Sequence, residues 1–204
     1  MNETGLYIRH DNMNALQLCI KRMLDIVFSI IGLVVLSPVF LIITLLLKKS
    51  WKDSAFFTQE RIGKDGVPFT IYKFRTITEA PGSEPTLRAE IDDTISTPLQ
   101  AKLRKLHLDE LPQLWNVLKG DMSFVGPRPE RQYFIEKIMQ RTGDYRLVLE
   151  MRPGITSEAS IYNGYTDTID KMIKRMELDI RYLENRTLWM DITIIFDTIF
   201  AIFK

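Results

Sequence analysis

The stretch Ile26–Leu47, IVFSIIGLVVLSPVFLIITLLL, contains 22 consecutive residues without a charge and decides the architecture of the chain. As one straight helix it would be about 33 Å long, which is enough to cross a bilayer core of roughly 30 Å. It is too long for the apolar core of a signal peptide, and the Lys48-Lys49-Ser50-Trp51 that follows does not resemble a cleavage site. We therefore expect a membrane segment, with a buried core helix as the weaker alternative.

Two features of this stretch favour a hairpin in the membrane over a span. Lysine or arginine flanks both ends, at positions 21, 22, 48, 49 and 52, so both ends should prefer the cytoplasm. Ser37-Pro38 lies near the midpoint, where proline removes a backbone donor and the Ser37 hydroxyl can bind a freed backbone group. We predict a re-entrant helix-break-helix, and a tilted single span remains the alternative.

The overall composition excludes several classes of protein. The 204 residues carry 27 Lys or Arg against 26 Asp or Glu, so the net charge of +1 gives no reason to expect a nucleic-acid partner. The single cysteine, Cys19, excludes a disulfide scaffold and a Cys-based zinc site. We expect residues 1–50 to form an N-terminal segment with the membrane hairpin, and residues 51–204 to form one cytosolic domain.

The first part of that domain predicts a small β-hairpin. Residues 55–62 and 68–74 are β-type runs on either side of the turn at residues 63–66. Residues 48–75 carry seven Lys or Arg against three acids, which places a basic collar beside the membrane. Residues 76–99 are acidic and proline-rich, and they predict a surface loop.

The second part of the domain predicts helices, so the fold class is α+β and mostly helical. Apolar spacing predicts helices over residues 110–119, 131–141 and 168–184. Asp109 is expected to be the N-cap of the first helix, and Gly120 its C-terminal stop. Residues 188–203 are apolar apart from a thin stripe of two acids, Asp191 and Asp197. They predict either a helix that closes the core or an amphipathic helix lying at the membrane interface.

Common catalytic motifs are missing from the sequence. It contains no GxxxxGK[ST], GxGxxG, HExxH or CxxC motif. His107-Leu108-Asp109 loosely resembles a kinase catalytic loop, but Asn116 follows Asp109 by seven residues instead of five and no glycine-rich loop precedes it. We therefore exclude a kinase.

The remaining candidate chemistry centres on Asp109-Glu110 and on Arg128. Two adjacent carboxylates can provide a nucleophile and a ligand for Mg²⁺, which binds one or two carboxylates together with substrate phosphates. Arg128 lies between two prolines, which restrict its backbone, and its guanidinium suits bidentate binding of phosphate. Taken singly, Asp109 is more simply a helix cap and Arg128 a surface charge. Together, beside a membrane hairpin, they indicate phosphate chemistry.

The chain resembles the bacterial sugar transferases and, more narrowly, the small monotopic phosphoglycosyl transferases. The resemblance starts near residue 18 and keeps the order of the family's motifs. These motifs are Lys21-Arg22, Ser37-Pro38, Phe57-Thr58-Gln59, Tyr72-Lys73-Phe74-Arg75-Thr76, Leu108-Asp109-Glu110-Leu111-Pro112-Gln113, Asn116-Val117-Leu118-Lys119-Gly120-Asp121-Met122-Ser123, Val125-Gly126-Pro127-Arg128-Pro129 and Arg152-Pro153-Gly154-Ile155-Thr156.

This resemblance implies transfer of a sugar 1-phosphate from a UDP-sugar to polyprenol phosphate, such as undecaprenyl phosphate, with release of UMP. It implies that Asp109 attacks the β-phosphate and forms a phosphosugar-aspartyl intermediate. Glu110 and Asp179 would hold Mg²⁺, the cofactor. Arg128, Lys73 and Arg75 would bind the substrate phosphates.

The resemblance also implies a setting. The enzyme would carry out the first membrane step in the assembly of a glycoconjugate, such as an exopolysaccharide, an O-antigen or a glycoprotein glycan. It would lie in the bacterial cytoplasmic membrane, with the catalytic domain on the cytoplasmic face, membrane lipid as a partner and a homo-oligomer left open.

One segment departs from the family's pattern. After Thr156 many members continue with Gly and an Ala-Gln-Val-Asn-Gly-Arg stretch, whereas this chain has Ser160 in place of the Gln and Tyr165 in place of the Arg. Contacts to uridine or sugar in this region are therefore not implied. Two other functions remain as alternatives: a membrane-anchored phosphohydrolase that uses Asp109 with water as the acceptor, and a non-enzymatic membrane adaptor.

Overall fold

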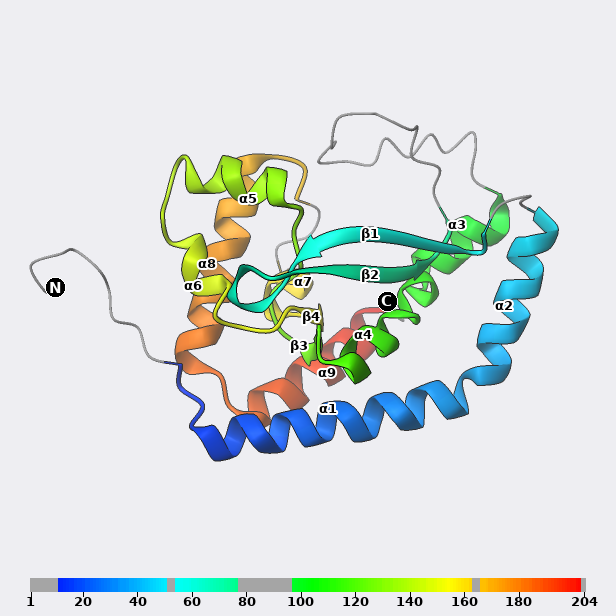
Figure 1. Cartoon of the computed structure of the whole chain (residues 1–204), viewed down its shortest axis with the longest axis horizontal. Helices are drawn as coiled ribbons and strands as arrows, with labels where there is room; N and C mark the ends of the chain where they lie inside the picture. Colours follow the sequence, from blue (N-terminus) through cyan, green and yellow to red (C-terminus); the bar gives the residue numbers. More distant parts are fainter. Residues whose placement is uncertain (1–10, 51–53, 77–96, 163–165, 203–204) are drawn as a thin grey trace, which may run out of the picture.

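The computed structural model describes residues 11–50, 54–76, 97–162 and 166–202 (Figure 1). It begins with a long helix, α1 (Ala15–Val35), and a second helix, α2 (Ser37–Ser50). A 59° bend separates them. In this part of the chain no single helix is long and apolar enough to cross a membrane, but the bent pair could do so by length and composition. The predicted helix-break-helix is confirmed.

The break lies at the predicted Ser-Pro pair and has a local explanation. In an unbroken helix the backbone N–H of residue 38 would donate to the carbonyl of Val34, and Pro38 has no N–H. The Ser37 hydroxyl donates to that same carbonyl at 2.8 Å. Helical bonding resumes where the Phe40 N–H donates to the Leu36 carbonyl at 2.9 Å. The predicted use of the Ser37 hydroxyl is confirmed.

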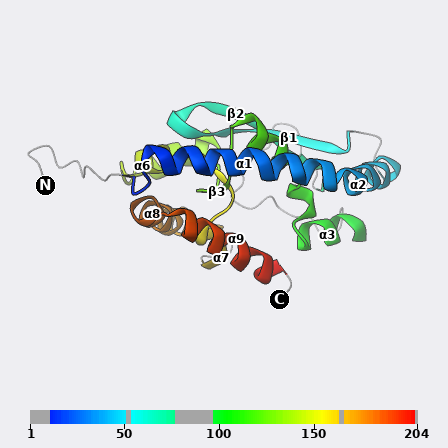
Figure 2. The ribbon, with the colours of Figure 1, turned by 90° about the horizontal axis from the view of Figure 1, so that it is seen from below.

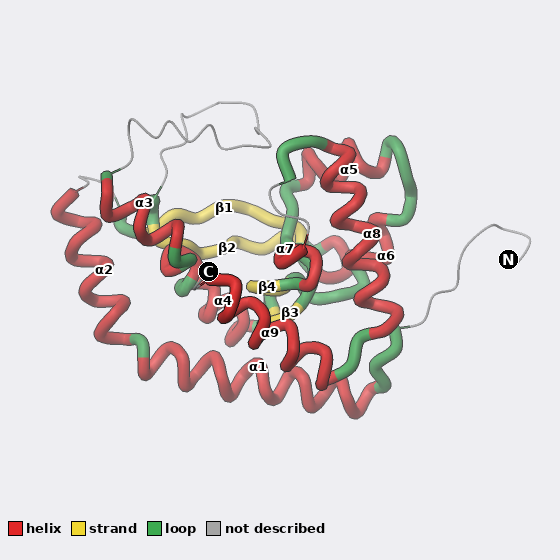
Figure 3. The backbone as a smooth tube through the Cα atoms, turned by 180° about the vertical axis from the view of Figure 1, so that it is seen from behind, coloured by secondary structure: helices red, strands yellow, loops and turns green. Residues whose placement is uncertain are grey.

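The predicted β-hairpin is also present. Strands β1 (Phe56–Ile62) and β2 (Pro68–Phe74) pair antiparallel, from Phe56 opposite Phe74 to Ile62 opposite Pro68. The connecting turn is closed by Asp65 at φ 58° and Gly66 at φ 75°. The hairpin reaches from the end of the molecule that holds α2 and α3 to the end that holds α5, α6 and α8 (Figure 3).

Helices make up most of the remaining structure, together with one short parallel strand pair. The elements are α3 (Pro98–Lys105), α4 (Gln113–Lys119), β3 (Ser123–Val125), α5 (Gln132–Met139), α6 (Tyr145–Val148), β4 (Gly154–Thr156), α7 (Glu158–Tyr162), α8 (Ile169–Asn185) and α9 (Leu188–Ile202). The helices predicted over 131–141, 168–184 and 188–203 are confirmed to within a few residues.

Five of these elements were not predicted: the helices α3, α6 and α7 and the paired strands β3 and β4. Helix α3 replaces the end of the predicted loop over residues 76–99, because Thr97 caps its N-terminus with a capping box and Pro98 fits its first turn. Most of the rest of that loop lies outside the described residues.

The predicted role of Asp109 as an N-cap is wrong. Asp109 lies inside a tight 3₁₀ turn, Leu108–Glu110, and α4 begins only at Gln113, after Pro112. The turn forms because the Glu110 N–H donates to the His107 carbonyl and the Leu111 N–H to the Leu108 carbonyl. Gly120, at φ 100°, ends α4 as predicted.

The predicted N-terminal and catalytic parts pack against one another. Ile43 and Leu47 of α2 lie in one buried apolar cluster with Phe74 of β2 and Leu103 of α3. A second cluster joins α5, α6 and α8 at the far end of the molecule.

Three of the described helices, α1, α2 and α9, present several large apolar side chains to the outside. Seen from below, α1 crosses the view and α9 lies beside it (Figure 2). Of the two acids on α9, Asp191 is buried and accepts hydrogen bonds from Lys21 and Tyr182. The aromatic side chains Trp189, Phe196 and Phe200 of the same helix are exposed. Ile194 of the same helix packs into the core, so α9 closes the core with one side and leaves an apolar side uncovered.

Candidate active site

A single asparagine docks α4 on the β-hairpin and thereby assembles the site. Asn116 is fully buried; its Oδ1 accepts from the Tyr72 N–H at 3.1 Å, and its Nδ2 donates to the Thr70 carbonyl at 2.7 Å. This docking brings Lys73, the next residue of β2, to the turn that precedes α4. The Lys73 ammonium donates to Glu110 Oε1 at 2.5 Å.

The loop that carries Arg128 is fixed by backbone bonds to β4. The Gly126 N–H donates to the Thr156 carbonyl at 3.0 Å, and the Gly154 N–H donates to the Pro127 carbonyl at 2.9 Å. A Cβ on Gly126 would lie 2.3 Å from the Arg152 carbonyl oxygen, so this close approach requires glycine. The loop thus holds a defined position, and the side chain of Arg128 extends from it.

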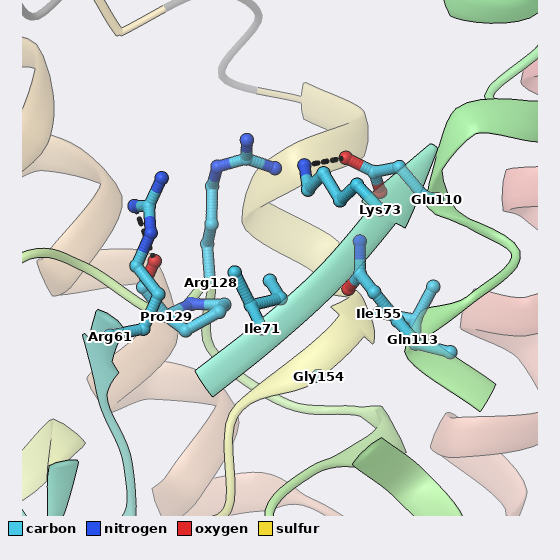
Figure 4. Close-up of a pocket in the computed structure, with 9 residues that line it drawn as sticks. All are labelled: Arg61, Ile71, Lys73, Glu110, Gln113, Arg128, Pro129, Gly154 and Ile155. Carbon is cyan, nitrogen blue, oxygen red and sulfur yellow. Dashed lines mark hydrogen bonds and ion pairs between the residues drawn. The ribbon is translucent and has the colours of Figure 1, made fainter. Parts of the chain in front are cut away.

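The lysine, the glutamate and the arginine meet in one pocket (Figure 4). The guanidinium of Arg128 points toward the ammonium of Lys73, and among the described residues no hydrogen bond or ion pair occupies that guanidinium. Lys73 is already paired with Glu110, so the guanidinium of Arg128 is the group that is available to an anionic ligand, with Lys73 adding positive charge beside it. The pocket is lined by Arg61, Ile71, Lys73, Glu110, Gln113, Arg128, Pro129, Gly154 and Ile155.

Asp109 and Glu110 are adjacent in sequence, but their pKa values shift in opposite directions. Burial alone would raise the pKa of Glu110, but the charges of Lys73 and Arg128 lower it to about 2. Burial and the charge of Glu110 raise the pKa of Asp109. Glu110 is therefore ionised near neutral pH, and Asp109 is the more basic carboxylate of the pair.

The structure does not bring every predicted site residue into the pocket. Asp109 lies in the same turn as Glu110 but is not one of the residues that line the pocket. Arg75 donates through Nε to the Ser54 carbonyl at 2.9 Å, at the start of the hairpin, and does not line the pocket. Asp179 is buried on α8 and does not line the pocket either. Burial and the nearby charges of Glu130 and Glu158 raise its pKa to about 7, against the effect of Arg175. Its role as a metal ligand stays a prediction.

The donor set fits a magnesium ion only if the substrate contributes. Among the residues that the structure describes, no group of three or more His, Cys, Asp or Glu side chains could hold a metal. Mg²⁺ typically binds one or two carboxylates and completes its shell with phosphate oxygens and water. The ionised Glu110, with Asp109 beside it, meets that requirement.

The sequence reasoning missed one cation of the pocket, Arg61. Its Nη1 donates to the Pro129 carbonyl at 3.0 Å, and its guanidinium lies 3.8 Å from a carboxylate oxygen of Glu130. Arg61 lies two residues after the Phe57-Thr58-Gln59 motif, on the strand paired with the one that carries Lys73. That position in the hairpin is the signal that could have identified it.

Comparison of the sequence with known proteins identifies its family. The family model "Bacterial sugar transferase" matches residues 16–204. The UDP-glucose:undecaprenyl-phosphate glucose-1-phosphate transferase of Klebsiella pneumoniae is 38% identical over 92% of this chain and 41% of its own length. The UDP-N-acetylgalactosamine-undecaprenyl-phosphate N-acetylgalactosaminephosphotransferase of Aeromonas hydrophila is 37% identical over 88% of this chain and 43% of its own length.

A third relative is closer to this chain in size. The exopolysaccharide production protein ExoY of Sinorhizobium fredii is 37% identical over 89% of this chain and 84% of its own length. The chain thus spans less than half of the first two relatives but most of the third. The match over residues 16–204 confirms the resemblance drawn from the motifs: the chain belongs to the bacterial sugar transferase family.

Proposed function

We propose that the protein transfers a sugar 1-phosphate from a UDP-sugar to undecaprenyl phosphate and releases UMP. The observation that carries the proposal is the pocket in which Lys73 and Arg128 face each other beside the Asp109–Glu110 turn. The names of the Klebsiella and Aeromonas relatives support both substrates, and the ExoY relative supports a role in exopolysaccharide production.

In the first step Asp109 acts as the nucleophile. A carboxylate oxygen of Asp109 forms a bond to the β-phosphorus of the UDP-sugar. The bond from that phosphorus to the bridging oxygen breaks, and UMP leaves with the electron pair. Arg128 binds the phosphate oxygens with its two-pronged donor, and Lys73 adds positive charge where the transition state is most anionic.

In the second step undecaprenyl phosphate is the acceptor. One of its phosphate oxygens attacks the phosphorus of the phosphosugar-aspartyl intermediate, and the bond to Asp109 breaks and regenerates the carboxylate. Splitting the reaction in two means that the two anionic phosphate substrates need not occupy the pocket together. The raised pKa of Asp109 makes it a stronger nucleophile than an ordinary aspartate.

Glu110 is the residue we assign to Mg²⁺, which when bound would neutralise phosphate charge. Lys73 and Arg128 favour the ionised form of Glu110, because their charges lower the pKa of that carboxyl to about 2.

The bent helix pair would place this site at the membrane. We assign α1–α2 as a re-entrant hairpin whose two ends both face the cytoplasm, with the exposed apolar side of α9 lying at the interface. The site would then open at the cytoplasmic face of the bacterial inner membrane. Cysteines introduced at residues 2 to 15 should resist labelling from outside intact cells, and labelling there would mean a span. Replacing Ser37-Pro38 by Ala-Leu should make these cysteines accessible, because both helix-breaking residues are then gone.

A panel of UDP-sugars assayed for UMP release tests the proposal. With one member of the panel, UMP release beyond one equivalent per enzyme should require both Mg²⁺ and undecaprenyl phosphate, and a lipid-linked sugar diphosphate should form. Turnover that continues with water alone would identify a phosphohydrolase. No turnover with any UDP-sugar would favour the non-enzymatic adaptor.

A further inference from the structure

The two cations that precede the membrane stretch, Lys21 and Arg22, turn into the protein. The Lys21 ammonium donates to Asp191 at 2.5 Å and to the Val125 carbonyl at 3.0 Å, and its side chain is only 11% exposed. The Arg22 guanidinium donates to carbonyls of α4. Both side chains are therefore used inside the molecule, whereas Lys48 and Lys49 at the other end of the hairpin are exposed.

Arg22 binds the C-terminal end of α4 in a two-pronged manner. Its Nη1 donates to the Val117 carbonyl at 2.6 Å, and its Nη2 donates to the Leu118 carbonyl at 2.9 Å. The Val117 carbonyl also accepts from the Gly120 N–H at 3.1 Å, whereas Arg22 supplies a donor to the Leu118 carbonyl in the last turn. A cation at this end of α4 also complements the helix dipole. A planar guanidinium can bind two successive carbonyls at once, which an ammonium cannot reproduce with the same geometry.

The contact between α1 and α4 is close along its length. A Cβ on Gly120 would lie 3.2 Å from Arg22 Nη2, and a Cβ on Gly32 would lie 3.1 Å from Leu114 Cδ1. Two glycines, one on each side of the contact, thus permit this approach. Helices α1 and α4 are therefore packed directly against one another.

The opposite end of α4 leads into the reacting groups. Consecutive turns run from His107 through the Asp109–Glu110 turn into α4, linked by bonds such as Leu114 N–H to the Leu111 carbonyl at 3.1 Å. On the side toward the hairpin, Asn116 binds β2 next to Lys73. A displacement of α4 along α1 would therefore shift Glu110 and Asp109 relative to Lys73 and Arg128.

We propose that Arg22 is a positioning residue that locks α4 to the membrane helix α1 and so sets the Asp109–Glu110 turn against the phosphate-binding cations. This inference rests on the proposed roles of Asp109 and Glu110. Arg22 acts through the carbonyls of α4 and does not serve as a headgroup anchor for the hairpin.

The test compares Arg22→Lys and Arg22→Gln with Lys49→Gln, a matched loss of charge at the exposed end of the hairpin. All enzymes are purified in vesicles of one phospholipid composition, and kcat, KM for the UDP-sugar, membrane association and melting temperature are measured. Arg22→Lys keeps the charge but loses the two-pronged donor, so its kcat should fall at least about fivefold, and that of Arg22→Gln at least about tenfold. KM should change less than about twofold, because the phosphate-binding cations lie on other elements.

Lys49→Gln should keep the wild-type kcat, and all the variants should stay membrane-bound. A wild-type kcat in Arg22→Lys would overturn the inference, since charge alone would then suffice. So would a loss of activity in Arg22→Gln that matches its loss of membrane association or of folded protein.

An Asp109→Asn enzyme in the same assay distinguishes a failure of the positioning role of Arg22 from a failure of the proposed role of Asp109. If Asp109→Asn is inactive and Arg22→Lys is fully active, only the positioning role fails. An active Asp109→Asn enzyme would remove the roles on which the inference rests and would overturn both.

Discussion

Glu110 and Asp179 are two buried or half-buried acids that the sequence predicts for one metal site, and the structure gives them opposite environments. Glu110 receives the ammonium of Lys73 at 2.5 Å, and its pKa is lowered to about 2. Asp179 makes no hydrogen bond or ion pair with any described residue, and its pKa is raised to about 7.

The two pKa values differ because the nearest cation bonds to Glu110 in one case and to groups other than Asp179 in the other. Arg175 lies one helical turn before Asp179 on α8, but its guanidinium bonds to Glu130 and to the Thr166 hydroxyl. Among the described residues, the ammonium of Lys73 forms its ion pair with Glu110. Burial therefore decides the protonation of Asp179, whereas the ion pair decides that of Glu110.

Among substitutions of Lys73, Arg128 and Asp179, the largest loss of activity should follow from Lys73→Met, which removes the ammonium that pairs with Glu110. We expect activity to fall about a hundredfold, near the upper end of the 1.5–3 kcal/mol for a charged hydrogen bond. Lys73 lowers the pKa of both Glu110 and Asp109, so both pKa values should rise and the acid limb of the pH–activity profile should move to higher pH.

Lys73→Arg is the matched control, because it keeps the charge and should recover part of the activity. An unchanged acid limb in Lys73→Met would show that Lys73 does not set the ionisation of either carboxyl. Steady-state UMP release between low and neutral pH measures both quantities.

A smaller effect is expected from Arg128→Lys. Lysine keeps the positive charge that faces Lys73 but loses the planar donor for two phosphate oxygens. Activity should fall at least about tenfold, as for the loss of one charged hydrogen bond. The thermal shift produced by UDP should fall as well, and wild-type values for both would make Arg128 an ordinary surface charge.

The smallest effect on activity should come from Asp179→Asn. Asp179 does not line the pocket, so we expect activity and the Mg²⁺ requirement to stay within about twofold of wild type, against the roughly 10- to 100-fold cost of losing a group that supports a metal. A larger change in the Mg²⁺ requirement would restore Asp179 to the metal site.

Stability should respond to this substitution in a defined pH window. The folded pKa of about 7 lies above the ordinary value of 3.8, so the folded state binds the proton more tightly. In the wild type this term reduces the free energy of unfolding as pH rises from about 4 to about 7 and stays constant above that. The melting temperature of Asp179→Asn, relative to wild type, should therefore rise across this window; a constant difference would contradict the raised pKa.

Local signals predicted much of the fold. The Ser37-Pro38 break, the hairpin and the Gly120 stop all follow from the backbone limits of individual residues, and the structure confirms them. Asp109 was misplaced because an N-cap and a 3₁₀ turn share the same sequence signals, and only the positions of the Glu110 and Leu111 amide bonds distinguish them.

Long-range contacts could not be predicted from the sequence. The inward course of Arg22 depends on α4, which lies nearly a hundred residues later. The same holds for Arg61, whose partners lie on the loop after Arg128, and for Arg75, whose donors bind the start of the hairpin instead of the pocket. The sequence identifies charged residues, but packing determines which of them meet.

The most direct test of the central claim is the capture of a covalent intermediate on Asp109. Purified enzyme is incubated with a UDP-sugar carrying radiolabel in its sugar, with Mg²⁺ and without undecaprenyl phosphate, and then denatured. The wild type should retain one labelled sugar phosphate on Asp109, and addition of undecaprenyl phosphate before denaturation should discharge it. Asp109→Asn should fold with a melting temperature close to wild type, retain no label and release no UMP, because an amide cannot form the ester. A folded Asp109→Asn enzyme that releases UMP would contradict the account.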